Sequence, residues 1–123
     1  MSFLVEVEHR FHAVQGLRSP IRADRGLPPV RGVDVVVTAG IAFDDDQLTA
    51  RGWFFDTDAA SLTLQRVCAP LASRPWTELY AFRPTFELVA RHLHAELAEE
   101  LPQLAFLKIR DETFGVTTTY RPE

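Results

Sequence analysis

Two neighbouring segments with strand-like patterns constrain the fold of this chain most. From Phe3 to Val14, apolar and charged residues alternate with a period of two, which is typical of a strand with one buried face. One face would carry Val5, Val7, His9 and Phe11, and the other Glu6, Glu8, Arg10 and His12. The run from Val33 to Phe43 is rich in β-branched residues and predicts a second strand paired with the first.

The middle of the chain carries two helical patterns. Asp56 or Asp58 offers an N-cap acceptor for a helix that runs to about Leu71. Apolar residues near helical spacing on one face of this helix are Leu62, Val67 and Leu71. The second helix begins at Thr85 as N-cap, and Glu87 places negative charge in its first turn. Its apolar stripe consists of Val89, Leu93, Leu97 and Leu101.

The remaining segments are predicted to be connections and a closing hairpin. Residues 15–31 and 73–83 are predicted to be loops, and the apolar segment Trp53 to Asp56 is predicted to be extended. Ala105 to Asp111 and Val116 to Tyr120 predict two strands of a hairpin. The order ββααββ predicts an α+β fold, a four-stranded antiparallel sheet with two helices on one face.

Length and composition exclude several classes of protein. Residues 1–123 are enough for one domain with its own core. A net charge of −4, without a basic run beside aromatic residues, argues against a nucleic-acid partner. No apolar stretch approaches the roughly 20 residues that span a bilayer, and the acidic, strand-like N-terminus does not resemble a signal peptide. The single Cys68 predicts a small core residue in a cytoplasmic protein without disulfides.

Five short motifs occur in a specific order along most of the chain. They are Phe11–His12–Ala13, Gly52–Trp53–Phe54–Phe55–Asp56, Pro84–Thr85–Phe86–Glu87, Glu112–Thr113 and Tyr120–Arg121–Pro122–Glu123. In this order they resemble the 6-pyruvoyl-tetrahydropterin synthase family, which includes the 6-carboxy-tetrahydropterin synthases of queuosine biosynthesis. The resemblance implies the tunnelling fold, in which ββααββ subunits join their sheets into barrels. It also implies a homo-oligomer, a hexamer built as a dimer of trimers, with pterin pockets between subunits.

The residues that carry the family's zinc chemistry are largely missing. The family binds zinc through one His on the first strand and a His–Gly–His at the start of the second, where this chain has Arg31–Gly32–Val33. His12 matches the first-strand ligand, and His9 is the alternative match. A catalytic zinc site needs about three protein ligands, and a permanently charged guanidinium opposes a cation. We therefore expect no metal and no cofactor.

The family's other catalytic groups also lack counterparts. Its Cys falls near Leu27, in a segment without Cys. Its Asp–His pair falls on Ala72–Ser73 or on Pro75–Trp76, depending on where the loop gap is placed. Trp76 then either stacks on a ligand or anchors its loop. The resemblance thus implies that the zinc-dependent reaction is lost, and it assigns no catalytic residue.

The family's ring anchor is retained. Glu112, expected on a short strand of its own, matches the Glu that binds the guanidine-like edge of the pterin, where a carboxylate accepts two parallel N–H bonds. The alternative is a strand-end Glu paired with a neighbouring Arg. The resemblance adds Thr85, Glu87 and Thr113 as ligand contacts. Thr85 is also predicted to be the N-cap of the second helix, and Glu87 to place negative charge in its first turn. His12 without a metal is either a proton donor or acceptor, or a polar residue that faces a loop.

Two functions from different classes follow. The first is a binder of a pterin-like or purine-like heterocycle, with zinc-free chemistry or none. The second is an oligomeric scaffold or regulatory protein with a vestigial pocket. A weaker alternative is an active synthase that recruits metal through His9 and His12. His92 and His94 lie two apart on a helix and point to different faces, so we expect surface or subunit-contact residues.

Overall fold

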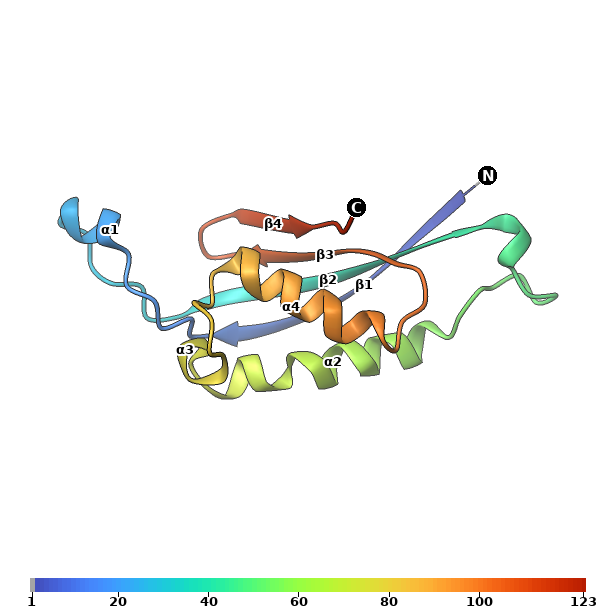
Figure 1. Cartoon of the computed structure of the whole chain (residues 1–123), viewed down its shortest axis with the longest axis horizontal. Helices are drawn as coiled ribbons and strands as arrows, with labels where there is room; N and C mark the ends of the chain where they lie inside the picture. Colours follow the sequence, from blue (N-terminus) through green and yellow to red (C-terminus); the bar gives the residue numbers. More distant parts are fainter. Residues whose placement is uncertain (1) are drawn as a thin grey trace.

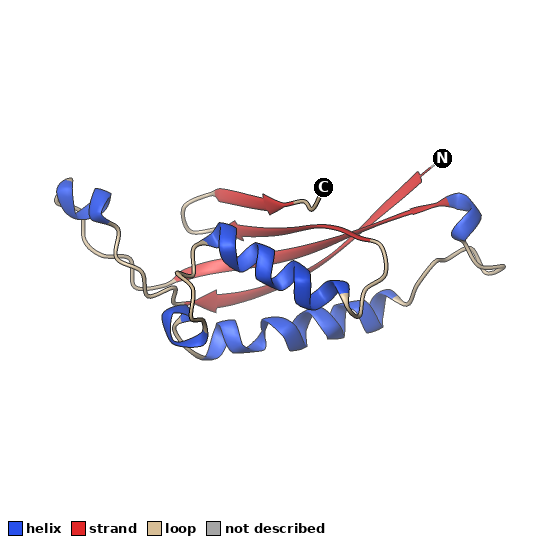
Figure 2. Cartoon of the chain, viewed as in Figure 1, coloured by secondary structure: helices blue, strands red, loops and turns tan. Residues whose placement is uncertain are grey.

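The computed structural model describes residues 2–123 and confirms the predicted ββααββ order. The strands are β1 (Ser2–Ala13), β2 (Val33–Asp44), β3 (Leu104–Asp111) and β4 (Val116–Tyr120). The helices are α1 (Pro20–Asp24), α2 (Thr57–Ser73), α3 (Trp76–Leu79) and α4 (Phe86–Ala98), with a 3-10 turn, η1, at Asp45–Gln47. One antiparallel sheet has the order β1-β2-β3-β4, and α2 and α4 lie side by side over one face of it (Figures 1 and 2).

The long β1–β2 ladder sets the register of the sheet. It runs from Ser2 opposite Asp44 to Ala13 opposite Val33. Val7, on the predicted apolar face of β1, is buried, and the charged residues of the other face are exposed, as the alternation predicted. Residues opposite each other in an antiparallel pair share a face, so this register decides which side chains meet.

The core lies between the sheet and the two long helices. Leu93 and Leu97 of the predicted α4 stripe are almost completely buried, because that stripe faces β3 and β4. For α2 the prediction was partly wrong, since Leu62 is 65% exposed. Four apolar side chains instead form the buried face of α2, namely Ala60, Leu64, Cys68 and Leu71.

Side-chain caps determine where the long helices begin. The Asp56 carboxylate accepts hydrogen bonds from the backbone N–H groups of Asp58, at 2.9 Å, and Ala59, at 3.1 Å, which identifies Asp56 as the N-cap of α2. The Thr85 hydroxyl accepts from Leu88 N at 3.2 Å, as predicted for α4. Each cap satisfies a backbone donor that a helix start leaves without an intrahelical partner.

The connecting segments differ from the prediction. The segment 15–31 contains α1, which begins with Ser19 as N-cap and Pro20 at the first helical position. The segment 73–83 contains the short α3. Trp53 to Asp56 is a bend before α2 and does not form a strand. Helices of one turn are too short to leave a periodic pattern in the sequence, which explains the two missed helices.

The open face, defined here as the sheet face opposite α2 and α4, is charged. Lys108 Nζ lies 3.3 Å from Glu6 Oε1 on this face. One aromatic ring is buried there, because Phe106 is only 3% exposed and covers Gly40, its partner in the ladder. A Cβ on Gly40 would lie 2.1 Å from the Phe106 ring, so the ring requires glycine at this position. None of the helices in residues 2–123 has the length and apolar character needed to cross a membrane.

Candidate functional site

Three of the predicted site residues meet around Asp34, at the start of β2. His12 is the ladder partner of Asp34, and its Nδ1 lies 3.1 Å from Asp34 Oδ1. Asp34 N donates to the Thr113 hydroxyl at 3.0 Å, and Glu112 N donates to Asp34 O at 2.8 Å. Backbone and side-chain bonds to a single residue thus fix His12, Glu112 and Thr113 relative to one another on the open face.

Glu112 lies in the turn that follows β3, so the expectation of a separate short strand was wrong. A hydrogen bond from Gly115 N to Asp111 O, at 2.8 Å, closes this turn. The carboxylate pairs with Arg10, whose Nη1 lies 2.5 Å from Glu112 Oε1. The alternative expected for Glu112, a strand-end Glu paired with a neighbouring Arg, therefore matches the surroundings of Glu112 in this chain.

These residues border a shallow cavity of about 500 Å³ on the open face. Its lining consists of Arg10, Phe11, His12, Asp34, Val35, Val36 and Glu112. Two carboxylates, one guanidinium and one imidazole face the same space, so it offers both hydrogen-bond acceptors and donors to a polar ring. The His12 and Asp34 side chains are 65% and 75% exposed, so solvent screens their interaction within one chain.

Thr85 and Glu87 line neither this cavity nor the larger one described below. Both belong to the start of α4, where the Thr85 hydroxyl is the N-cap and Glu87 is exposed. Within a single chain, the structure therefore does not bring them into the cavity beside Glu112. Their cap and first-turn roles were predicted from sequence and are confirmed.

The site region does not offer a set of zinc ligands. The His12 ring lies against Gly32, since a Cβ on Gly32 would be 2.5 Å from His12 Nε2, so His12 does neighbour the tripeptide that the resemblance indicated. The flanking residues are Arg31 and the buried Val33. Residues 2–123 contain no group of three His, Cys, Asp or Glu side chains that could hold a metal ion. His9 and His12 lie on opposite faces of β1, an arrangement that does not allow a shared metal.

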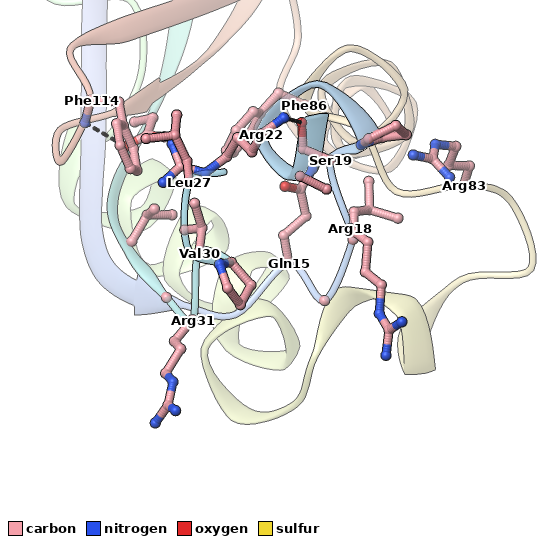
Figure 3. A pocket seen from close by; sticks show the side chains of 18 residues that line it. Gln15, Arg18, Ser19, Arg22, Leu27, Val30, Arg31, Arg83, Phe86 and Phe114 are labelled. Carbon is pink, nitrogen blue, oxygen red and sulfur yellow. Dashed lines mark hydrogen bonds between the residues drawn. The ribbon is translucent and has the colours of Figure 1, made fainter. Parts of the chain in front are cut away.

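A larger cavity of about 750 Å³ was not predicted. It lies between the segment 15–33, the start of α4 and the β3–β4 turn, and it includes Leu27, near which the resemblance placed the family's Cys. Figure 3 shows its side chains, among them the arginines Arg18, Arg22, Arg31 and Arg83. The sequence feature that could have indicated this cavity is the concentration of Arg residues in an otherwise acidic chain.

The other candidate residues are structural. Burial, and secondarily the charge of Glu96, raises the pKa of Cys68 to about 12, so the thiol stays protonated near neutral pH and is a core residue as predicted. Trp76 is completely buried and donates from Nε1 to Leu71 O at 3.0 Å, which confirms it as a loop anchor. His94 was expected to be a surface or subunit-contact residue, but within one chain it is only 8% exposed, because α4 packs this side against Tyr120 of β4, with ring centroids 5.3 Å apart.

Comparison with known proteins supports the fold. No family model matches the sequence, and no curated protein matches it. Among solved structures, the chain is similar to that of Caenorhabditis elegans 6-pyruvoyl tetrahydropterin synthase, with a TM-score of 0.74 and 16% sequence identity. The match covers 100% of this chain and 97% of that chain. It confirms the α+β tunnelling fold that the order of motifs predicted.

Proposed function

We propose that the protein is a divergent homologue of 6-pyruvoyl-tetrahydropterin synthase that binds a pterin-like or purine-like heterocycle through Glu112. We further propose that it no longer carries out the zinc-dependent reaction. The observation that carries this proposal is the position of Glu112 in the open-face cavity, beside His12 and Asp34, within a fold shared over the whole chain.

Glu112 has the chemistry for the anchoring role. A carboxylate accepts two parallel N–H bonds from an amino-pyrimidinone edge, and the negative charge strengthens both. The Thr113 hydroxyl and the Glu112 backbone N–H are both bonded to Asp34, which holds the turn in place. Arg10, which contacts Glu112 Oε1, would supply a donor to a carbonyl oxygen of the same ring.

His12 places an imidazole in this cavity, which offers both a hydrogen-bond donor and an acceptor to a ligand. Its contact with the Asp34 carboxylate would orient the imidazole, as carboxylates do for histidines at many sites. Thr85 and Glu87 lie outside the cavity within one chain. We propose that they reach the ligand across a subunit boundary, since the resemblance implies pockets between subunits.

The donor groups near His12 support the proposed loss of zinc chemistry. Arg31 and Val33 flank Gly32, where a zinc site would require two imidazoles. The guanidinium is always protonated and opposes a cation. We therefore propose a small-molecule ligand without a metal cofactor. A chain whose lone cysteine is buried also suits the reducing cytoplasm.

We propose a homo-oligomer, a hexamer, as the working form. The strands β1 and β4 each pair on one side only within residues 2–123, which leaves two sheet edges with free backbone groups. Exposed apolar side chains lie on both edge strands, including Leu4 at 54% and Val116 at 55%. Joining such edges between subunits satisfies the backbone groups and removes the risk of uncontrolled pairing.

One observation favours a second function. The ion pair between Arg10 and Glu112 occupies the carboxylate that the heterocycle needs. If this pair persists in the assembly, the cavity is vestigial and the protein is an oligomeric scaffold or a regulatory subunit. The two functions differ in whether a heterocycle stabilises the folded protein.

The test is a thermal-shift screen of pterins and purines, followed by calorimetry of the best ligand, because a ligand of the native state raises its apparent stability. Glu112→Gln should weaken binding about tenfold to a hundredfold, since a broken charged hydrogen bond costs about 1.5–3 kcal/mol. Glu100→Gln is the matched control, because Glu100 also pairs with an arginine, Arg66. No ligand in the screen, or equal affinity in Glu112→Gln, would favour the scaffold.

A further inference from the structure

One end of the β1–β2 ladder extends beyond the rest of the sheet. Residues 2–4 pair with residues 42–44, whereas the pairing of β2 with β3 reaches only as far as Ile41. We call this end, together with the connection to the first residues of α2, the tip; it consists of residues 2–4 and 42–58. Figure 1 shows the tip at the end of the molecule opposite α1. The tip therefore lies apart from both cavities, and it has no residue in common with either of them.

Stacked aromatic rings form one side of the tip. Phe3 stacks on Phe43 with ring centroids 5.5 Å apart, and Phe43 stacks on Phe54 with centroids 4.8 Å apart. Phe55 packs edge-on against Phe54, at 5.9 Å. Phe43 is only 7% exposed, but Phe3 is 44% exposed, and Trp53, which directly precedes Phe54, is 46% exposed. The tip thus presents aromatic surface to solvent, and apolar surface with a polar rim is typical of protein interaction sites.

A closed turn holds the backbone of Trp53. Thr49 N donates to Trp53 O at 2.8 Å, and Gly52 N donates to Thr49 O at 2.9 Å. Gly52 has a φ of +85°, which favours glycine at this position of the turn. Because the turn already restricts this backbone, a contact made through Trp53 loses less conformational entropy than one made by a flexible loop.

The net charge of the chain is concentrated at the tip. Five of the 17 acidic residues and only one of the 13 basic residues, Arg51, belong to it, so the other 12 acidic and 12 basic residues balance each other. The start of α2 explains Asp56, its N-cap, and Asp58, in its first turn. It does not explain the three consecutive aspartates that follow Phe43. All five acidic residues are exposed, namely Asp44, Asp45, Asp46, Asp56 and Asp58.

This charge determines which class of partner fits the aromatic surface. An anionic membrane surface or a nucleic acid carries phosphate groups, which the aspartates repel. A protein segment with Lys or Arg residues is attracted, because complementary charges steer association and favour the correct partner. Exposed aromatic rings beside negative charge therefore fit a segment that is both apolar and basic.

We propose that the tip is a docking surface for a segment of another protein that combines an apolar or aromatic side chain with Lys or Arg residues. The apolar side chain packs on Phe3 and Trp53, since buried aromatic side chains dominate the energy of many interfaces. The basic side chains lie against the aspartates of the tip. This function goes beyond heterocycle binding. It is also separate from the joining of sheet edges, which uses the backbone groups of edge strands.

The test measures peptide binding to the full chain by calorimetry. The probe is the acetylated peptide Lys-Leu-Arg-Phe-Lys-Leu. One control peptide has Glu in place of each Lys and Arg, and the other has Ser in place of each Leu and Phe. We expect the affinity of the probe to be at least about tenfold above that of either control, because only the probe makes both kinds of contact. Rising sodium chloride should weaken the probe, since its charged contacts are exposed.

Tryptophan fluorescence locates the bound peptide. The chain has two tryptophans, and Trp76 is completely buried, so the neutral quencher acrylamide reports mainly on Trp53. The probe itself contains no tryptophan. Binding at the tip should therefore reduce quenching by acrylamide. Binding with unchanged quenching would place the peptide elsewhere and would overturn the proposal.

The variants separate the aromatic contacts from general exposure of apolar groups. Trp53→Ser, alone and together with Phe3→Ser, should lower the affinity for the probe, with a loss of at least about tenfold in the double variant. The matched control is Ile21→Ser, Leu62→Ser, because Ile21 and Leu62 are 64% and 65% exposed and lie outside the tip. This control should bind the probe as the wild type does.

A second pair of variants separates local charge from net charge. Asp46→Asn, Asp58→Asn should lower the affinity for the probe and its dependence on salt. The matched control is Asp24→Asn, Glu78→Gln, which removes the same charge from exposed residues of α1 and α3, outside the tip. All four side chains are exposed, so the fold should be preserved.

The remaining outcomes identify other occupants. Failure of the probe to bind, equal binding of a control peptide, or equal losses in the control variants would overturn the proposal. A fall in the oligomer mass of Trp53→Ser in light scattering would show that a second copy of the chain covers the tip. Binding of vesicles of phosphatidylcholine and phosphatidylserine that is lost in Trp53→Ser would show a membrane contact. Either of these results would also overturn the proposal.

Discussion

Arg10 and Glu112 are paired across the sheet, although 102 positions separate them in the sequence. Arg10 Nη1 lies 2.5 Å from Glu112 Oε1. Arg10 belongs to β1 and Glu112 follows β3, and both strands flank β2, so the pair spans the central strand beside Asp34. The pair ties two strands that share no backbone hydrogen bonds with each other.

This pair should contribute little to stability. The Arg10 side chain is 64% exposed and that of Glu112 is 34% exposed, so solvent screens their attraction. We expect a coupling energy of about 0.2–1 kcal/mol from a double-mutant cycle of Arg10→Gln and Glu112→Gln in urea unfolding. High salt should reduce it. A coupling well above this range would mean that the pair is a structural element and not a dispensable contact.

The purified protein should contain no stoichiometric zinc. The resemblance matches only one of the family's three zinc ligands to a histidine of this chain, His12. The positive charge of Arg31 would oppose a cation beside His12. Elemental analysis after dialysis should give far less than one zinc per chain. A value near one per chain would refute this and restore the active-synthase alternative.

The protein should form an oligomer larger than a dimer, because both sheet edges are open in a single chain. Val116→Lys places a charge on the β4 edge and should shift the mass towards the monomer. Leu62→Lys is the matched control, since Leu62 is 65% exposed on α2 and away from the sheet edge. Light scattering at micromolar concentration measures both, and a monomeric wild type would contradict the prediction.

The two tryptophans should differ sharply in their contribution to stability. Trp76 is completely buried, donates a hydrogen bond to Leu71 O, and packs edge-on against Phe86 with ring centroids 5.5 Å apart. Trp76→Ala should lower the free energy of unfolding by about 3–5 kcal/mol. Trp53→Ala should cost less than about 1 kcal/mol, because Trp53 is 46% exposed. Urea unfolding of both variants provides the measurement, and similar losses would contradict the assignment of Trp76 as the loop anchor.

Stability should fall at alkaline pH. Burial raises the pKa of Cys68 from 9.0 to about 12, so the unfolded thiol loses its proton at a lower pH than the folded one. The corresponding stability is present below pH 9 and is lost as the pH rises to about 12, at up to about 1.4 kcal/mol per pH unit. Burial likewise raises the pKa of Tyr80 from 10.0 to about 12, which adds to the decline above pH 10.

The variants Cys68→Ala and Tyr80→Phe test these two contributions. Each should flatten the decline of unfolding free energy between pH 9 and 12, although Cys68→Ala also removes packed volume and lowers stability at all pH values. The slope, and not the absolute stability, is therefore the readout. An unchanged slope in both variants would show that other groups control the alkaline transition.

The sequence by itself determined the four strands, the two long helices and their order. The alternation along β1 and the apolar stripe of Val89, Leu93 and Leu97 on α4 are local patterns, because strand and helix geometry repeats every two and every 3.6 residues. Asp56 and Thr85 were identifiable as caps for the same reason, since a cap bonds to backbone groups two or three residues away. The order of these elements and motifs was enough to predict the tunnelling fold.

The tertiary structure decided which distant side chains meet. Arg10 reaches Glu112 only because both flank β2. The larger cavity likewise brings the segment 15–33 together with Arg83 and Phe114. His94 is buried because β4 covers that side of α4, which no helical pattern reveals. Contacts of this kind depend on strand register and on the packing of the helices against the sheet. Exposed ion pairs contribute little to stability and follow no periodic pattern in the sequence. They are therefore recognised only from their positions in the folded chain.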